Sequence, residues 1–220
     1  MEIELKYLAD GPLERDKILK DKHLESIKEE GTEEEIEMKA VYFDTGNLCM
    51  CRKGFAFRIR YENGIPIATL KWGGKVEGGL HTRGELNVPV DVQYAENPST
   101  DIFKGSDIWE EINMLVGDKK LVPIMEVNCV RQQYMVDTGR SIDVVSLDVG
   151  EIITQKGSAP ISEVEIELYS GDCEDMKALG KELAAKYNLR EGVKSKFQVG
   201  LEILGYDTVD KCRQNFYVFL

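Results

Sequence analysis

The chain has 220 residues, enough for one domain with a substantial core. Hydrophobic residues make up 42% of it and charged residues 31%, which is typical of a soluble globular protein. The formal net charge of −12 argues against a protein that binds nucleic-acid backbones, although a local cluster of Arg and Lys could still bind a small anion.

The cysteines and the start of the chain predict a cytoplasmic protein. The cysteines are odd in number and form no C-x-x-C pair, so neither a disulfide framework nor a zinc site is indicated. Met1-Glu2 is unlike a signal peptide, and no apolar run approaches the length of a membrane span. We expect no nucleic-acid and no membrane partner, and a homodimer stays open.

The first strand is predicted at residues 1–6. Read at period two, Glu2, Glu4 and Lys6 lie on one face, and Ile3 and Leu5 on the other. After Gly11-Pro12 the pattern predicts a short helix over 13–21, a strand over 23–30, a strand over 34–44 and about one helical turn over 48–53.

The next segments predict an antiparallel hairpin. Residues 55–61 alternate apolar side chains with Arg58 and Arg60, and Asn63-Gly64 is a hairpin turn signal. The returning strand, 65–72, carries Lys71 on one face. Glycine pairs bracket a mobile loop at 73–79, and the strand over 80–89 carries Arg83 and Glu85 at alternate positions. His81 is expected to orient this glycine-rich loop or to lie on the surface.

The second half of the chain repeats the charged pattern. Residues 91–117 read as helical, and 121–136 with 141–149 as a hairpin. The strand over 160–169 places Glu163, Glu165 and Glu167 in register. Helices follow at 172–187 and 195–204, and residues 205–220 form a tail that caps the site, joins a dimer or packs on the outside.

Charged residues at alternate positions on at least four strands predict a closed sheet with its charged faces inward and its apolar faces covered by helices. A single E-x-E-x-K strand is usually a solvated face. Charges inside a closed sheet are unfavourable without partners, so their recurrence indicates a ligand or dense mutual pairing. Carboxylates suit hard divalent cations, and Arg and Lys suit phosphate oxygens.

These motifs together resemble the CYTH superfamily, the triphosphate tunnel metalloenzymes. The resemblance starts at the E-x-E-x-K strand, continues through Tyr42-Phe43-Asp44-Thr45, the strand with Arg58 and Arg60, and the Gly-Gly-Leu-His-x-Arg-x-Glu stretch, and ends at Ser195-Lys196. It covers most of residues 1–200 in order. The glycine-rich stretch and the Glu-Leu-Tyr-Ser-Gly-Asp run are most similar to the bacterial inorganic triphosphatase branch.

The resemblance implies an α+β fold, a closed eight-stranded antiparallel β-tunnel with a charged interior and flanking helices, over residues 1–204. It implies hydrolysis of inorganic triphosphate with Mg²⁺ or Mn²⁺. The implied metal ligands are Glu2, Glu4, Asp148, Glu163, Glu165 and Glu167. The implied phosphate-binding residues are Lys6, Arg58, Arg60, Lys71, Arg83, Arg131 and Lys196. Glu4, Lys6, Arg60 and Asp148 are the implied catalytic residues.

Three alternatives stay open on these residues. The triphosphate could belong to thiamine triphosphate or to ATP, which such an enzyme would hydrolyse or cyclise. A non-catalytic module that binds polyphosphate or nucleotides needs only the basic residues. A structural barrel would pair its charges internally and would bind neither metal nor triphosphate.

Overall fold

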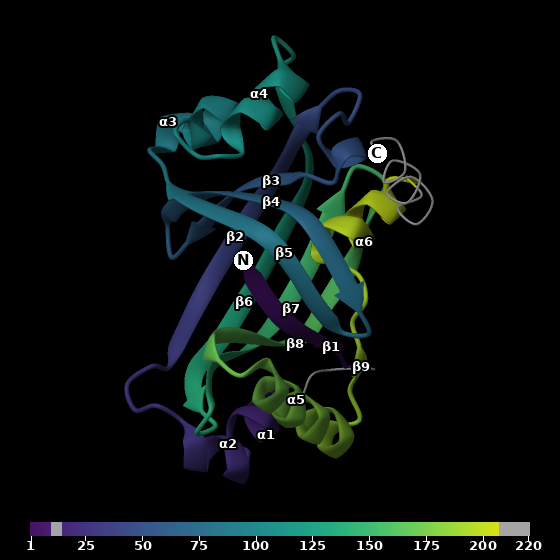
Figure 1. Ribbon diagram of the computed structural model, residues 1–220. Helices are drawn as coiled ribbons and strands as arrows, with labels where there is room; N and C mark the ends of the chain where they lie inside the picture. Colours follow the sequence, from purple (N-terminus) through teal and green to yellow (C-terminus); the bar gives the residue numbers. More distant parts are fainter. Residues whose placement is uncertain (10–14, 207–220) are drawn as a thin grey trace.

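The computed structural model describes residues 1–9 and 15–206, and its main feature is a closed antiparallel barrel (Figure 1). The strands run in the order β5-β4-β3-β2-β6-β7-β8-β1, and the ring closes because β1 pairs with both β8 and β5. A two-residue strand, β9 (Arg190–Glu191), adds to β1. The predicted eight-stranded tunnel is therefore confirmed, with one short extra strand. The barrel strands are β1 (Glu2–Leu8), β2 (Glu34–Thr45), β3 (Ala56–Glu62), β4 (Ile65–Glu77), β5 (Leu80–Pro89), β6 (Leu121–Asp137), β7 (Ser141–Thr154) and β8 (Gly157–Gly171).

The outer face of the barrel is apolar and carries two groups of helices. α1 (Arg15–Leu19), α2 (Lys22–Ile27) and α5 (Cys173–Tyr187) pack on β1, β6, β7 and β8. η2 (Thr100–Phe103) and α4 (Trp109–Val116) cover β2 to β5, next to the short α3 (Val92–Glu96) (Figure 1). η1 (Cys51–Lys53) connects β2 to β3. Within the described residues no helix is both long enough and apolar enough to cross a lipid bilayer.

Strand alternation places opposite chemistry on the two faces of the wall. On β3, Phe57 and Ile59 are almost fully buried in the outer core, whereas Arg58 and Arg60 alternate with them in sequence and face the lumen. The same alternation runs around the ring, so the predicted orientation, with charges inside and apolar residues outside, is confirmed for the strands that carry the site.

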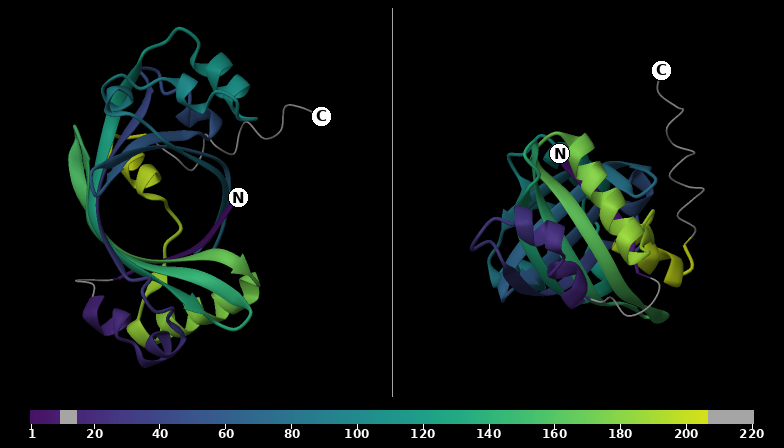
Figure 2. Two further views of the ribbon diagram at one scale, coloured as in Figure 1. Left: turned by 90° about the vertical axis from the view of Figure 1, so that its left-hand side faces the viewer. Right: turned by 90° about the horizontal axis from the view of Figure 1, so that it is seen from below.

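One end of the lumen is apolar and is filled by α6 (Lys196–Ile203), which lies within the ring of strands in the end-on view of Figure 2. Ser195 and Gln198 cap its start with reciprocal side-chain hydrogen bonds. Phe197 stacks on Tyr42 with ring centroids 5.2 Å apart. A Cβ at Gly200 would lie only 2.3 Å from Met125 Sδ, so glycine permits this close packing.

Two predicted elements are wrong. Residues 23–30 were expected as a strand, but Asp21 accepts hydrogen bonds from the backbone N–H groups of His23 and Leu24 and starts α2 instead. The expected mobile loop at 73–79 is mostly strand, because β4 continues to Glu77 across an irregularity between Trp72 and Lys75. The expected tail extends beyond Tyr206 and there lies outside the described residues.

Candidate active site

The lumen gathers every site residue that the sequence predicted. Strand β8, which carries the three glutamates, lies directly beside β1. In their register Lys6 lies opposite Glu165, and Glu4 lies opposite Glu167. Lys196, the first residue of α6, reaches the same wall from inside. The lumen cations are Lys6, Arg58, Arg60, Lys71, Arg83, Arg131 and Lys196, and the lumen carboxylates are Glu2, Glu4, Glu62, Glu85, Asp148, Glu163, Glu165 and Glu167.

The first zone of the lumen, which we term the paired zone, contains Asp148, Glu163 and Glu165 with Lys6, Arg131 and Lys196. Arg131 makes a bidentate contact with Asp148 at 2.7 Å. Lys6 and Lys196 share the same oxygens of Glu163 and Glu165, at 2.5–3.1 Å. Burial opposes ionisation of Glu165, but Lys196, Lys6 and Arg131 hold its pKa well below its ordinary value. Three carboxylates are thus balanced by three cations.

The second zone, the acidic zone, has an excess of negative charge. Glu2, Glu4, Glu85 and Glu167 lie here with only two cations. Lys71 contacts Glu2 at 2.8 Å and Glu85 at 2.6 Å, and Arg83 contacts Glu2 at 2.5 Å and Glu4 at 2.9 Å.

Glu167 has no ion-pair partner among the residues that the structure describes. Burial and repulsion by Glu2, Glu85 and Glu4 raise its pKa to about 7. A bound cation would relieve this repulsion.

The third zone, the basic zone, has an excess of positive charge on β3. Arg58 makes no ion pair with any described residue, its Nη1 donates to the Tyr42 hydroxyl at 3.3 Å, and its Nε is buried without a partner. Arg60 contacts Glu62 at 2.7 Å, yet burial and the neighbouring Arg58 lower its pKa to about 10. Two neighbouring guanidinium groups that share one carboxylate, Glu62 beside Arg60, leave a positive charge that suits an anion.

Two groups of oxygen ligands could hold a metal ion. The carboxylates of Asp148, Glu163 and Glu165 place one oxygen each within 4.8 Å of one another. They are the more compact group, but ammonium and guanidinium groups already neutralise them. The acidic zone, by contrast, has four carboxylates and two cations, which leaves a charge of −2 when Glu167 is ionised. A divalent cation matches that charge, and carboxylate oxygens are the ligands that hard cations prefer. On this charge balance the acidic zone fits a metal better.

Sequence reasoning missed three lumen residues and left the position of a fourth, His81, open between two options. Glu62, Glu85 and Tyr42 face the lumen but were not expected in the site. The alternation of Arg83 with Glu85 was a usable signal for Glu85, since residues two apart share a face. His81 does not lie on the surface, because it is 3% exposed and its Nε2 donates to the Gly192 carbonyl at 2.7 Å.

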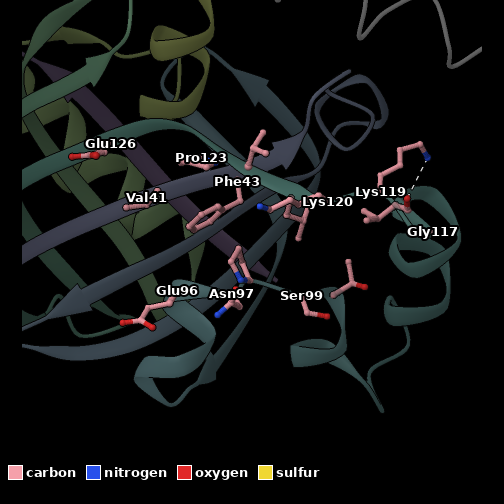
Figure 3. Close-up of a pocket in the computed structure, with 15 residues that line it drawn as sticks. Val41, Phe43, Glu96, Asn97, Ser99, Gly117, Lys119, Lys120, Pro123 and Glu126 are labelled. Atoms are coloured by element: carbon pink, nitrogen blue, oxygen red, sulfur yellow. Dashed lines mark hydrogen bonds between the residues drawn. The ribbon is translucent and has the colours of Figure 1, made fainter.

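The outside of the barrel holds cavities of different character. One of about 580 Å³ lies between α4 and the outer faces of β2 and β6, with Val41 and Phe43 in its wall (Figure 3). Of the two lysines in its wall, Lys119 donates hydrogen bonds to the carbonyl groups of Leu115 and Val116. No cluster of opposite charges converges there like that in the lumen, so we assign the candidate site to the lumen.

Comparison with known proteins connects this lumen to one family. A family model described as the CYTH domain matches residues 1–201. The inorganic triphosphatase of Haemophilus influenzae is 33% identical over 135 residues, a match that covers 61% of this chain and 37% of that protein. The match therefore spans well under half the length of that relative.

Solved structures share the fold. One is a Hippeastrum protein that is described as a proposed adenylyl cyclase with a dominant triphosphatase activity. It superposes with a TM-score of 0.67 at 23% identity, and the match covers 92% of this chain and 96% of that one. A Pyrococcus horikoshii protein superposes with a TM-score of 0.55 at 21% identity, covering 92% and 99%. At these identities the likeness concerns the barrel alone.

Proposed function

The chain belongs to the CYTH domain family, and on that premise we propose that it hydrolyses inorganic triphosphate to diphosphate and phosphate in the barrel lumen, with Mg²⁺ or Mn²⁺. The named activity of the Haemophilus influenzae relative supports this choice of substrate. The proposed catalytic domain is residues 1–204.

The separation of charge within the lumen is the observation that carries the proposal. The paired zone is neutral, the acidic zone carries excess carboxylates, and the basic zone on β3 carries excess guanidinium groups. A purely structural barrel would gain nothing from leaving Arg58 and Glu167 without opposite partners, since buried unpaired charges are costly. A triphosphate with a bound divalent cation supplies both missing charges.

The acidic zone is where a metal ion would be held. Glu2, Glu4 and Glu167 offer carboxylate oxygens on adjacent strands, and burial together with the negative charge gathered there raises the pKa of Glu167. Mg²⁺ completes its coordination shell readily with water and phosphate oxygens, so few protein ligands are needed. When bound, such an ion would polarise phosphoryl oxygens and neutralise developing charge. The carboxylates of the paired zone, Asp148, Glu163 and Glu165, are a second possible set.

The chain's own residues would bind and orient the substrate. Arg58 and Arg60 would bind phosphate oxygens through their guanidinium N–H groups, and Lys6, Lys71, Arg83, Arg131 and Lys196 would surround the rest of the chain of phosphates. The side chains already form an ordered electrostatic environment, which is the main source of rate enhancement in phosphoryl transfer.

A carboxylate would accept the proton of the attacking water. Despite burial, neighbouring cations hold the pKa of both Glu4 and Asp148 below the ordinary value, so the choice between them rests on their contacts. Glu4 suits this role better because Asp148 is held by two cations, Arg131 and, at 2.8 Å, Lys196. Asp148 would instead orient those two cations. Among the described residues Glu4 makes one ion pair, with Arg83 at 2.9 Å, and it lies opposite Glu167.

Phosphate release tests the function. The protein is incubated with tripolyphosphate, ATP and thiamine triphosphate, each with Mg²⁺, with Mn²⁺ and with a chelator, and phosphate, diphosphate and cyclic AMP are measured. We expect metal-dependent release of phosphate and diphosphate from tripolyphosphate. Binding of tripolyphosphate without turnover under any metal condition would contradict an enzyme and would support a binding module.

A further inference from the structure

Strand β1 changes its neighbour at Lys6. Residues 2–5 pair with β5, and Tyr7 and Leu8 pair on the same edge with β9. At the junction, the Lys6 N–H donates to the Gly79 carbonyl at 2.9 Å, and the Gly192 N–H donates to the Lys6 carbonyl at 2.8 Å. The backbone of Lys6 thus joins the β4–β5 hairpin to the segment that leads into α6.

His81 ties the same three segments together through a side chain. It lies on β5, opposite Glu4 of β1, and its Nε2 is 2.7 Å from the Gly192 carbonyl oxygen. A carbonyl oxygen only accepts, so Nε2 carries the proton in this contact. Burial lowers the pKa of His81, and the neutral imidazole is sufficient as a donor.

Gly192 contacts Lys6 closely as well. A Cβ at position 192 would lie 2.6 Å from Lys6 Cγ and 3.0 Å from Lys6 Cδ, so the aliphatic part of the lysine packs directly against the glycine. Four residues, 192–195, then lead to Lys196. The Nζ atoms of Lys6 and Lys196 share Glu163 Oε2, at 3.1 and 2.5 Å, and Glu165 Oε1, at 2.6 and 2.9 Å.

We propose that His81 is a positioning residue that fixes the separation of Lys6 and Lys196 by holding the Gly192 carbonyl. The inference rests on the proposed function, in which both lysines contact the phosphates. His81 touches neither substrate nor metal in this role. Its hydrogen bond holds residues 192–195, which lead to Lys196, close to strand β1, which carries Lys6.

The test compares two amides that differ in reach. In His81→Gln the amide nitrogen takes nearly the place of Nε2 and can still donate to Gly192, whereas in His81→Asn the side chain is too short. The other histidine, His23, is exposed on α2 and pairs with Glu182, so His23→Asn is the matched control. Steady-state kinetics on tripolyphosphate and hydrogen exchange of the peptide covering 188–195 are measured for each.

We expect His81→Asn to lower kcat/KM about 10- to 100-fold, as is typical when a residue that orients a contacting group is lost. In His81→Asn the backbone amides of residues 188–195 should also exchange faster. His81→Gln should keep a kcat/KM and an exchange rate close to those of the unaltered protein. His23→Asn should change neither kcat/KM nor exchange. In a Lys196→Gln background the effect of His81→Asn on kcat/KM should largely disappear. Unaltered exchange and kcat/KM in His81→Asn would overturn the proposal, as would an equal loss in His81→Gln.

Two further outcomes are separable. If the unaltered protein releases no phosphate from tripolyphosphate, the proposed function is wrong. If hydrogen exchange of residues 188–195 is unchanged in His81→Asn, the proposed role of the His81 contact is wrong, whatever the activity. If His81→Asn does not fold, Gly192→Ala perturbs the same point from the Lys6 side. Wild-type kcat/KM for Gly192→Ala would then count against the proposal.

Discussion

Replacing Glu167 by Gln should stabilise the metal-free protein at pH 8 and weaken its binding of Mn²⁺. Burial and repulsion by Glu2, Glu85 and Glu4 raise the pKa of Glu167 from 4.5 to about 7. Because the folded-state pKa lies above the unfolded one, the folded state binds more protons between these values, and stability falls as the pH rises through that window. Glutamine removes the charge that causes the loss.

The size of the effect follows from the two pKa values. The difference between 4.5 and about 7 corresponds to about 3 kcal/mol, at about 1.4 kcal/mol per pKa unit. Glu167 is only partly buried, and solvent screens part of the repulsion, so we expect Glu167→Gln to gain about 1–3 kcal/mol at pH 8. At pH 4.5 the gain should be close to zero, because most of the Glu167 side chain in the folded protein is then protonated.

Urea denaturation with a chelator present, at pH 4.5 and pH 8, measures the stabilities, and isothermal titration at pH 8 measures Mn²⁺ affinity. Glu151→Gln is the matched control, since Glu151 is an exposed strand carboxylate and its replacement should change neither quantity. Destabilisation of Glu167→Gln at pH 8, or Mn²⁺ affinity equal to that of the unaltered protein, would refute the account of the acidic zone.

Three further changes test the other zones. Arg58→Ala should raise the KM for tripolyphosphate about 10- to 100-fold, as expected for one charged hydrogen-bond donor, with little change in urea midpoint because no carboxylate loses a partner. Arg131→Ala should instead destabilise by about 3–5 kcal/mol, since it leaves Asp148 buried without its bidentate partner, and an unchanged midpoint would contradict the pairing. Glu4→Gln should lower kcat on the order of 10²- to 10³-fold with Mg²⁺, and full turnover would exclude Glu4 from the site.

The barrel could be predicted because its signal is local and periodic. Alternation on β1, β3 and β8 fixes which side chains share a face, and the charged faces could be satisfied together only in a closed interior. The strand expected at 23–30 failed for a local reason: Asp21 caps a helix, and Leu24 of that helix packs in the outer core. The glycine pairs at 73–79 suggested a loop, although strand pairing with β5 extends to Glu77.

The site residues could be named, but not their partners. Sequence alternation assigns Arg58 and Arg131 the same chemistry, yet within residues 1–9 and 15–206 Arg131 pairs with two carboxylates and Arg58 with none. That difference depends on which strands become neighbours around the ring, which residue spacing does not specify. His81 was ambiguous for the same reason, because its partner, Gly192, is 111 residues away.

Closure of the barrel by β1 also has a consequence for how the chain folds. The contact between Lys6 and Glu165 joins residues 159 positions apart, and such non-local pairing forms slowly, in about milliseconds to seconds. Until it forms, the facing edges of β8 and β1 are unpaired, even where β1 already pairs with β5, and open strand edges invite association with other chains. Inward-pointing charges on an edge strand discourage that association. During folding, the charges of Glu2, Glu4 and Lys6 would therefore disfavour pairing of this edge with other chains. In the folded protein the same side chains line the lumen.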